Sequence, residues 1–140
     1  WSSYHRLVHR EASHAGTLSL HIIQPNPFFQ TKKILTEEEK LLHQNSYPVE
    51  PHVVQGYPKL ISRIPALQNH GLIIENFTSI FDEETETMWM DSAHANKKGA
   101  QIILKRIGVL IKNNKNKIFN LSEINPKEPS LNIVNENQCE

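Results

Sequence analysis

The start of the chain has a helical period of apolar residues followed by a compact apolar stretch. Apolar residues from Trp1 to Val8 recur at nearly helical spacing, with charged residues between them, and Gly16 stands where such a helix would end. Residues 17–24 are rich in Leu, Ile and small side chains and run into a Pro-Asn-Pro turn at 25–27. This pattern predicts an amphipathic helix and then a strand. Because the strand is almost continuously apolar, it is typical of a parallel strand buried on both faces.

The middle of the chain predicts two further helices. Thr36 and Glu39 have the spacing of a capping box, in which each residue bonds the backbone of the other at the start of a short helix. Residues 52–68 keep helical spacing of apolar side chains. Within them, Pro58 is expected in the first turn, and Pro65 is expected to kink or shorten the end.

The second half of the chain predicts strands and a final helix. Residues 72–74 are a second compact apolar strand, and residues 88–90 predict a third, short one. Asn96 is expected to cap the last helix, whose lysines face water. The apolar stripe of this helix consists of Ala100, Ile103, Ile107, Leu110 and Ile111. Residues 113–140 are rich in Asn and Lys, which predicts a largely unstructured tail.

The order of these elements predicts an α/β fold built on a parallel sheet. Two or three strands are few for a parallel sheet that helices must cover on both faces. The chain also begins with Trp1, whereas a translated chain normally begins with Met, which indicates either a processed product or a piece of a longer protein. Together these features predict that the chain is a piece of a longer protein and that N-terminal strands are missing.

Composition and charge exclude several classes of protein. Lys and Arg total 15 and Asp and Glu total 15, so no net charge attracts nucleic acid. No apolar run approaches the roughly 18 residues of a membrane span. Cys139 is the only cysteine, which excludes an intrachain disulfide and a cysteine-based zinc cluster.

Charge is nevertheless unevenly distributed along the chain. Residues 75–91 contain six acidic and no basic residues, while residues 97–117 contain seven basic and no acidic residues. The acidic run is interpreted as a solvated loop, with a metal or cationic-ligand site as the alternative. The lysines Lys32, Lys33 and Lys40 are also expected to be solvated.

Asp91 and His94 form the sharpest chemical motif in the sequence. They are three residues apart, between a predicted strand end and the cap of the last helix. In such a loop the carboxylate can accept the imidazole Nδ1 proton and leave Nε2 to take a proton from a nucleophile. Open α/β sheets place their sites at this edge. The alternative is that Asp91 caps a turn and His94 is a surface residue.

The surroundings of this motif resemble a known family. The segment MWMDSAHANKKGAQII is similar to the final conserved segment of the SGNH hydrolases, also called GDSL-like esterases and lipases. In that family an Asp-x-x-His pair precedes Asn-x-x-Gly and a helix. The matching positions here are Asp91, His94, Asn96 and Gly99, and the helix continues through Ala100 and Ile103.

A second segment upstream resembles one branch of the same family. LSLHIIQPNPFF is similar to a strand and loop of that branch, which continues with K-x-L-T-x-x-E. The matching positions of this continuation are Lys33, Leu35, Thr36 and Glu39. The two segments occur in the family's order, and the resemblance covers residues 1–112.

The resemblance implies a flavodoxin-like three-layer sandwich and hydrolysis of carboxylic (acyl or acetyl) esters by a serine nucleophile, without a cofactor. His94 would be the base and Asp91 the acid that orients it. The family's Gly-Asp-Ser segment and its oxyanion residues lie upstream of the matched part, and no G-x-S-x-G motif replaces them here. Residues 1–112 are therefore predicted to supply the Asp-His half of a catalytic triad. The implied partners are the missing N-terminal part of the domain and an ester substrate, such as an acetylated carbohydrate or a lipid.

Two other interpretations of the sequence stay open. The chain can be a noncatalytic binding or structural module on a hydrolase-like fold. A weaker hypothesis is a metal-binding helical domain, because His5 and His9 are four residues apart on the first helix. His21, within a strand, is expected to be a hydrogen-bonded core histidine.

Overall fold

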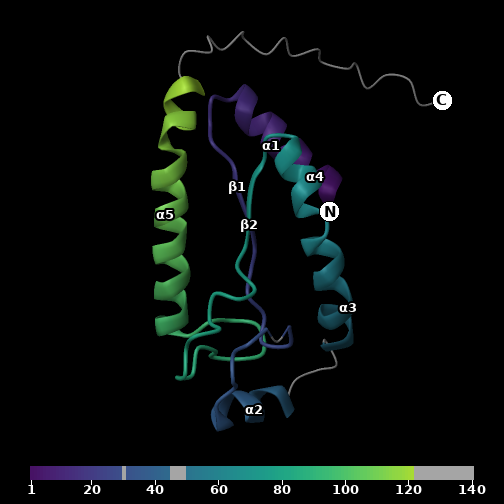
Figure 1. Cartoon of the computed structure of the whole chain (residues 1–140), viewed down its shortest axis with the longest axis vertical. Coiled ribbons are helices and arrows are strands. Elements are labelled where there is room, and N and C mark those ends of the chain that lie inside the picture. The colour runs from purple at the N-terminus through teal and green to yellow at the C-terminus, as the bar shows by residue number, and fades with distance from the viewer. Residues whose placement is uncertain (30, 45–49, 122–140) are drawn as a thin grey trace, which may run out of the picture.

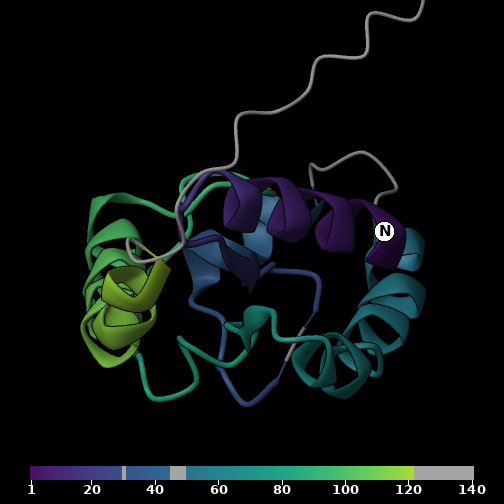
Figure 2. The ribbon, with the colours of Figure 1, turned by 90° about the horizontal axis from the view of Figure 1, so that it is seen from above.

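The computed structural model of the chain describes residues 1–29, 31–44 and 50–121. In chain order these residues form α1 (Ser2–His14), β1 (Leu20–Ile23), α2 (Glu37–Gln44), α3 (Glu50–Ile61), α4 (Ile64–Asn69), β2 (Ile73–Asn76) and α5 (Lys97–Leu121). Figure 1 shows the two strands between α5 on one side and α3 and α4 on the other, and the view from above in Figure 2 agrees. The chain is thus a mixed α/β structure, as predicted.

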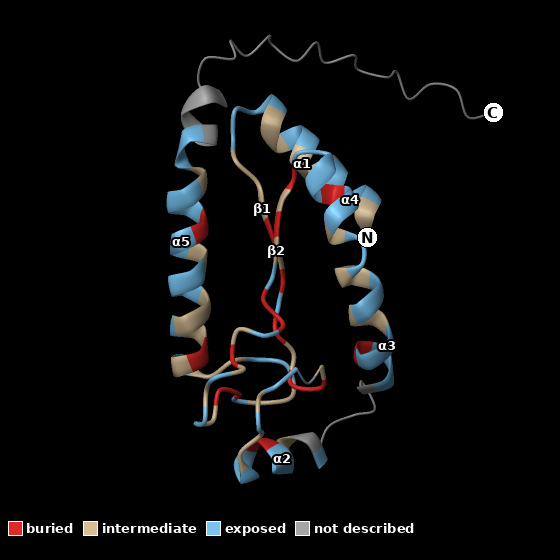
Figure 3. Ribbon diagram, viewed as in Figure 1, coloured by how far each residue is buried: buried red, intermediate tan, exposed pale blue. Residues whose placement is uncertain are grey.

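The two strands pair in parallel, which confirms the prediction from their apolar character. Leu20 lies opposite Ile73 and Ile23 opposite Asn76, and the described residues contain no third strand in this sheet. Buried residues follow the strand pair in Figure 3. Because the strands are parallel, both carboxyl ends lie at one edge, and the loops that follow β1 and β2 start there together.

Helix α1 ends as the sequence predicts. Gly16 has a φ of 64°, a left-handed conformation that a glycine adopts without steric cost, and it follows the last helical residue by two positions. His21 of β1 is buried, and its Nδ1 lies 2.7 Å from Nδ1 of His5 on α1. The prediction of a hydrogen-bonded core histidine at this position is confirmed.

The helix expected over residues 52–68 is two helices, α3 and α4. Pro58 lies inside α3 near its C-terminal end, so its expected place in a first turn is wrong. Pro65 lies in the first turn of α4, where its missing N–H removes no helical hydrogen bond. The proline that was expected to kink one helix therefore starts the next.

Two further boundaries differ from the sequence predictions. Residues 88–90 form no strand, because the chain turns back after one antiparallel bridge between Trp89 and Ala95. Helix α5 continues to Leu121, so residues 113–121 of the predicted tail are helical, and residues 122–140 lie outside the described residues. No helix in the described part of the chain combines the length and apolar character of a membrane span.

Two groups of buried side chains pack together within the core of the described residues. One joins Leu67, Leu72 and Ile74 beside the strands. The other joins Phe81, Met88 and Trp89, with Ile102 and Ile103 of α5 packed against it. Of the apolar stripe predicted for α5, Ile103 packs against this group and Leu110 is also buried, whereas Ile111 is 46% exposed.

Met88 and Met90 provide a matched test of this second core group. The Met88 side chain is fully buried, whereas Met90 is 64% exposed. We expect Met88→Ala to lower the free energy of unfolding of the intact protein by about 2–5 kcal/mol. Met90→Ala is expected to change it by about 0.5 kcal/mol or less. Chemical denaturation measures both, and equal effects would contradict this packing.

Candidate active site

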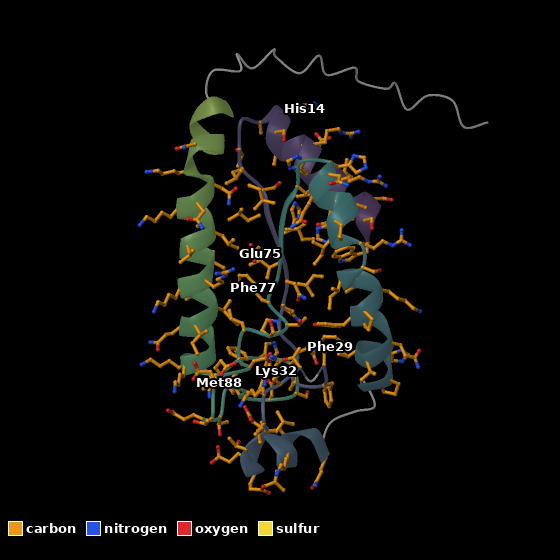
Figure 4. The ribbon with its side chains drawn as sticks, viewed as in Figure 1. His14, Phe29, Lys32, Glu75, Phe77 and Met88 are labelled. Atoms are coloured by element: carbon orange, nitrogen blue, oxygen red, sulfur yellow. The ribbon has the colours of Figure 1, made fainter. Side chains whose placement is uncertain are left out.

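The loops after β1 and β2 meet at the carboxyl edge of the sheet. Figure 4 places Phe29, Lys32 and Met88 together at this end of the molecule, opposite His14. Asp82 connects the two loops, because its carboxylate accepts hydrogen bonds from the Thr31 hydroxyl and the Lys32 N–H. Sites in open α/β sheets form at this edge.

Residues 88–96 form a tight hairpin-like loop, which is called the 88–96 loop below. The Met90 N–H donates to the His94 carbonyl over 2.8 Å, and the Asn96 N–H donates to the Met88 carbonyl over 2.8 Å. Asp91 and His94 occupy the tip of this loop. The pair is therefore carried by one rigid turn rather than by two separate elements.

Asp91 binds His94 through both backbone and side chain. Its Oδ1 accepts the N–H groups of Ala93 over 2.8 Å and of His94 over 2.7 Å. Its Oδ2 lies 2.8 Å from His94 Nδ1. The Ala93 N–H, and then the side chain and N–H of His94, lower the pKa of the Asp91 carboxyl to about 2.

The geometry of this pair fixes the state of the imidazole. An ionised carboxylate only accepts hydrogen bonds, so the His94 nitrogen beside it, Nδ1, must carry the proton. In the neutral ring Nε2 is then the basic nitrogen. The His94 side chain is 73% exposed, and no other hydrogen bond to its ring is found in the described residues. The predicted contact between Asp91 and His94 is present, and so are the features of the alternative, because Asp91 caps the turn and His94 lies at the surface.

Asn96 and Gly99 fasten the 88–96 loop to α5. The Asn96 Oδ1 accepts the Gly99 N–H over 2.9 Å, which confirms the predicted cap, and its Nδ2 donates to the Thr87 carbonyl over 2.6 Å. A Cβ on Gly99 would lie 2.7 Å from the Met88 carbonyl oxygen. Only glycine lets the first turn of α5 approach the loop this closely.

The acidic run is paired with α5. Lys98 lies 2.7 Å from Glu86 and 3.6 Å from Glu84, and Arg106 lies 3.3 Å from Glu75. The described residues contain no group of acidic, His or Cys side chains that could hold a metal ion.

The histidines of α1 also form no metal centre in the described part of the chain. The Nδ1 atom of His9 lies 3.0 Å from the Ser19 hydroxyl, and His5 pairs with His21. These contacts attach α1 to the segment that leads into β1 and to β1 itself.

Lys33 contradicts the prediction that it is solvated, and Glu39 has a contact beyond the capping box that the sequence does not predict. Lys33, expected to be solvated, has a side chain only 7% exposed and lies 3.1 Å from Glu39, which is fully buried. Glu39 closes the predicted capping box with Thr36, and its other oxygen accepts the Met88 N–H over 2.7 Å. The one sequence signal for this pairing is that Lys33 and Glu39 belong to the same K-x-L-T-x-x-E segment.

Gly99 and Gly108 allow a controlled test of how the loop meets α5. We expect Gly99→Ala to destabilise the protein, because the added methyl meets the Met88 carbonyl and the side chains of Ala95 and Phe81. Gly108→Ala adds a methyl on the same helix with nothing within 4 Å. It is expected to stabilise by up to about 1 kcal/mol, the helix-propensity difference. Equal shifts in chemical denaturation would show that the close approach is unimportant.

The Asp91 carboxyl should titrate far below its ordinary range. Carbon-13 NMR of this carboxyl is expected to show a midpoint near 2 instead of 3.8. Because the folded loop binds the ionised carboxylate, the stabilisation from these bonds is fully present above pH 3.8 and is lost as the pH falls towards 2. His94→Ala removes one of the bonds and should raise the midpoint part of the way. A midpoint near 3.8 in the unaltered protein would refute the hydrogen bonding.

Comparison with known proteins leaves this site to be interpreted from its own geometry. No protein-family model, curated protein or solved structure matches the chain. The resemblance to the SGNH hydrolases thus stays a prediction from two sequence segments.

Proposed function

We propose that this chain is the C-terminal part of an SGNH-type serine esterase and contributes the base and its orienting acid. The observation that carries the proposal is the ionised Asp91 held 2.8 Å from Nδ1 of an exposed His94. This arrangement leaves Nε2 basic and accessible. The proposal includes a flavodoxin-like three-layer sandwich, in which an upstream part of the domain adds strands to the parallel pair of β1 and β2.

In the proposed reaction, His94 Nε2 takes the proton of a serine hydroxyl from the upstream part as the oxygen attacks the ester carbonyl. The imidazolium that forms is stabilised by the Asp91 carboxylate. It then gives the proton to the leaving alcohol, and an acyl-enzyme remains. His94 activates water in the same way to release the acid. Acyl and acetyl esters, including those of carbohydrates and lipids, are the proposed substrate class.

Ser92 is a poor candidate for the nucleophile, although it stands between the two paired residues. The hydrogen bonds from the Ala93 and His94 N–H groups to Asp91 fix the turn that contains Ser92. Within the described residues, Ser92 makes no hydrogen bond to His94. A serine nucleophile acts from its own strand-to-helix turn that faces the base. The proposal therefore assigns the nucleophile to another segment.

Substitution of His94 tests the proposal. In the intact protein, His94→Ala should lower kcat/KM for a nitrophenyl acetate by roughly 10³-fold or more, because base and nucleophile act as a unit. Asp91→Asn should cause a smaller loss, since its amide N–H₂ opposes the proton on Nδ1. His14→Ala, at the opposite end of the molecule in Figure 4, is the control. Residues 1–140 alone should form no acyl-enzyme.

Two results would refute this function. One is unchanged ester hydrolysis after His94→Ala. The other is an intact protein that carries an upstream Gly-Asp-Ser segment and yet hydrolyses none of a broad ester panel. The second result would favour the noncatalytic binding or structural module.

A further inference from the structure

The carboxylate of Glu39 is fully buried at the base of the 88–96 loop. Its Oε1 accepts the Met88 N–H over 2.7 Å, and its Oε2 accepts the Thr36 N–H over 2.9 Å. The ammonium group of Lys33 lies 3.1 Å from Oε2. Capping alone explains the bond to Thr36 but not the bond to Met88, which is 49 residues away.

Lys33 attaches the same carboxylate to the segment that enters the loop. Its Nζ donates to the Glu86 carbonyl over 3.0 Å and to the Glu84 carbonyl over 3.4 Å. Thr36 adds a third attachment, because its hydroxyl lies 3.0 Å from the Thr87 hydroxyl. Residues 84–88 are thus held from one side by a single short stretch, residues 33–39.

Met88 is the point where this support reaches the 88–96 loop. Its N–H binds Glu39, its carbonyl accepts the Asn96 N–H, and its side chain is fully buried. The position of Met88 sets where the loop begins, and Asp91 and His94 follow within six residues. Reorientation of Met88 would therefore displace both members of the pair.

We propose that Glu39, held in place by Lys33, is a positioning residue that fixes the Asp91–His94 pair through the Met88 N–H. The effect on catalysis rests on the proposed function. The effect on the geometry of the pair does not depend on any activity.

The groups that surround the Glu39 side chain require a carboxylate at this position. Burial alone raises the pKa of the Glu39 carboxyl, but the N–H groups of Met88 and Thr36 and the Lys33 ammonium lower it overall, so the group is ionised at neutral pH. All three partners are donors. Glu39→Gln fills the same volume but turns an N–H₂ group towards one of these donors, so at least one bond is lost.

The decisive experiment compares Glu39→Gln with Glu37→Gln in the intact protein. Glu37 lies on the same helix, and its side chain is 86% exposed. Because both members of the pair are displaced, nitrogen-15 NMR of the His94 imidazole should show shifted ring signals in Glu39→Gln and no change in Glu37→Gln. With a nitrophenyl acetate, kcat should fall by roughly 100-fold in Glu39→Gln, as for a misplaced reacting group, while KM changes little.

Lys33→Met supplies an internal check on the mechanism. Alone it leaves the Glu39 charge buried without its cation, and it should disturb the His94 signals as Glu39→Gln does. In the Glu39→Gln background the same change should add little, because the charge it would leave unpaired is gone. Additive effects of the two substitutions would contradict action through one carboxylate.

The outcomes separate this inference from the proposed function. If Glu39→Gln lowers only the melting temperature and leaves the His94 spectrum unchanged, Glu39 is structural and the inference fails. If the unaltered protein hydrolyses no ester, the proposed function fails while the NMR result still decides the inference. Should Glu39→Gln not fold, Lys33→Met keeps the carboxylate but removes the ammonium group 3.1 Å from its Oε2, and it should shift the His94 signals in the same direction. Unchanged signals in that variant would overturn the inference.

Discussion

The bond from the buried Glu39 carboxylate to the Met88 N–H is the contact on which the candidate site depends. A charged group with no exposed surface is costly unless donors surround it, and Glu39 has three: two backbone N–H groups and an ammonium. Such a buried pair adds little net stability compared with apolar packing, but losing one partner is strongly destabilising. The main effect of the Lys33–Glu39 pair is therefore to hold Met88 in one position, and its contribution to the stability of the fold is small. The pair fixes the N-terminus of α2 on the segment that becomes the 88–96 loop.

The opposite side of that loop is fixed by backbone contact instead of charge. Asn96 bonds the loop and the first turn of α5 at once, and Gly99 lets that turn approach the Met88 carbonyl. Met88 is therefore held from two directions, by a carboxylate on one side and by a helix on the other. The short loop between Met88 and Asn96 has few remaining freedoms, since the Asp91 carboxylate also binds the N–H groups of Ala93 and His94. This explains how an exposed pair keeps a defined geometry without being buried itself.

The sequence predicts those features whose causes lie within a few residues. The Thr36–Glu39 capping box, the Asn96 cap, the Gly16 stop and the Asp91–His94 contact are all local, and the structure contains each.

The second role of Glu39 depends on a residue 49 positions away, and no periodicity encodes that contact. Lysine is usually a surface residue, and the ion pair with Glu39 is what allows the Lys33 side chain to be buried. Residues 88–90 have strand-like composition, but the hydrogen bonds of the turn end the pairing after one bridge. Helix α5 passes residue 112 although four of residues 113–121 are asparagine, a weaker helix former than lysine.

Glu39 is buried beneath the 88–96 loop, whereas Asp91 and His94 are exposed at its tip. This arrangement limits which groups can approach the His94 ring. Asp91 occupies Nδ1, so a reacting hydroxyl can meet only Nε2, on the side of the ring that faces away from the carboxylate. The hydrogen bonds of the 88–96 loop at Met88, Met90 and Asp91 do not involve His94 Nε2. In the proposed esterase, the nucleophile would therefore be carried by a separate segment. The edge where β1 and β2 end is the natural place for it, because each further parallel strand in the same direction would deliver its following loop to that same edge.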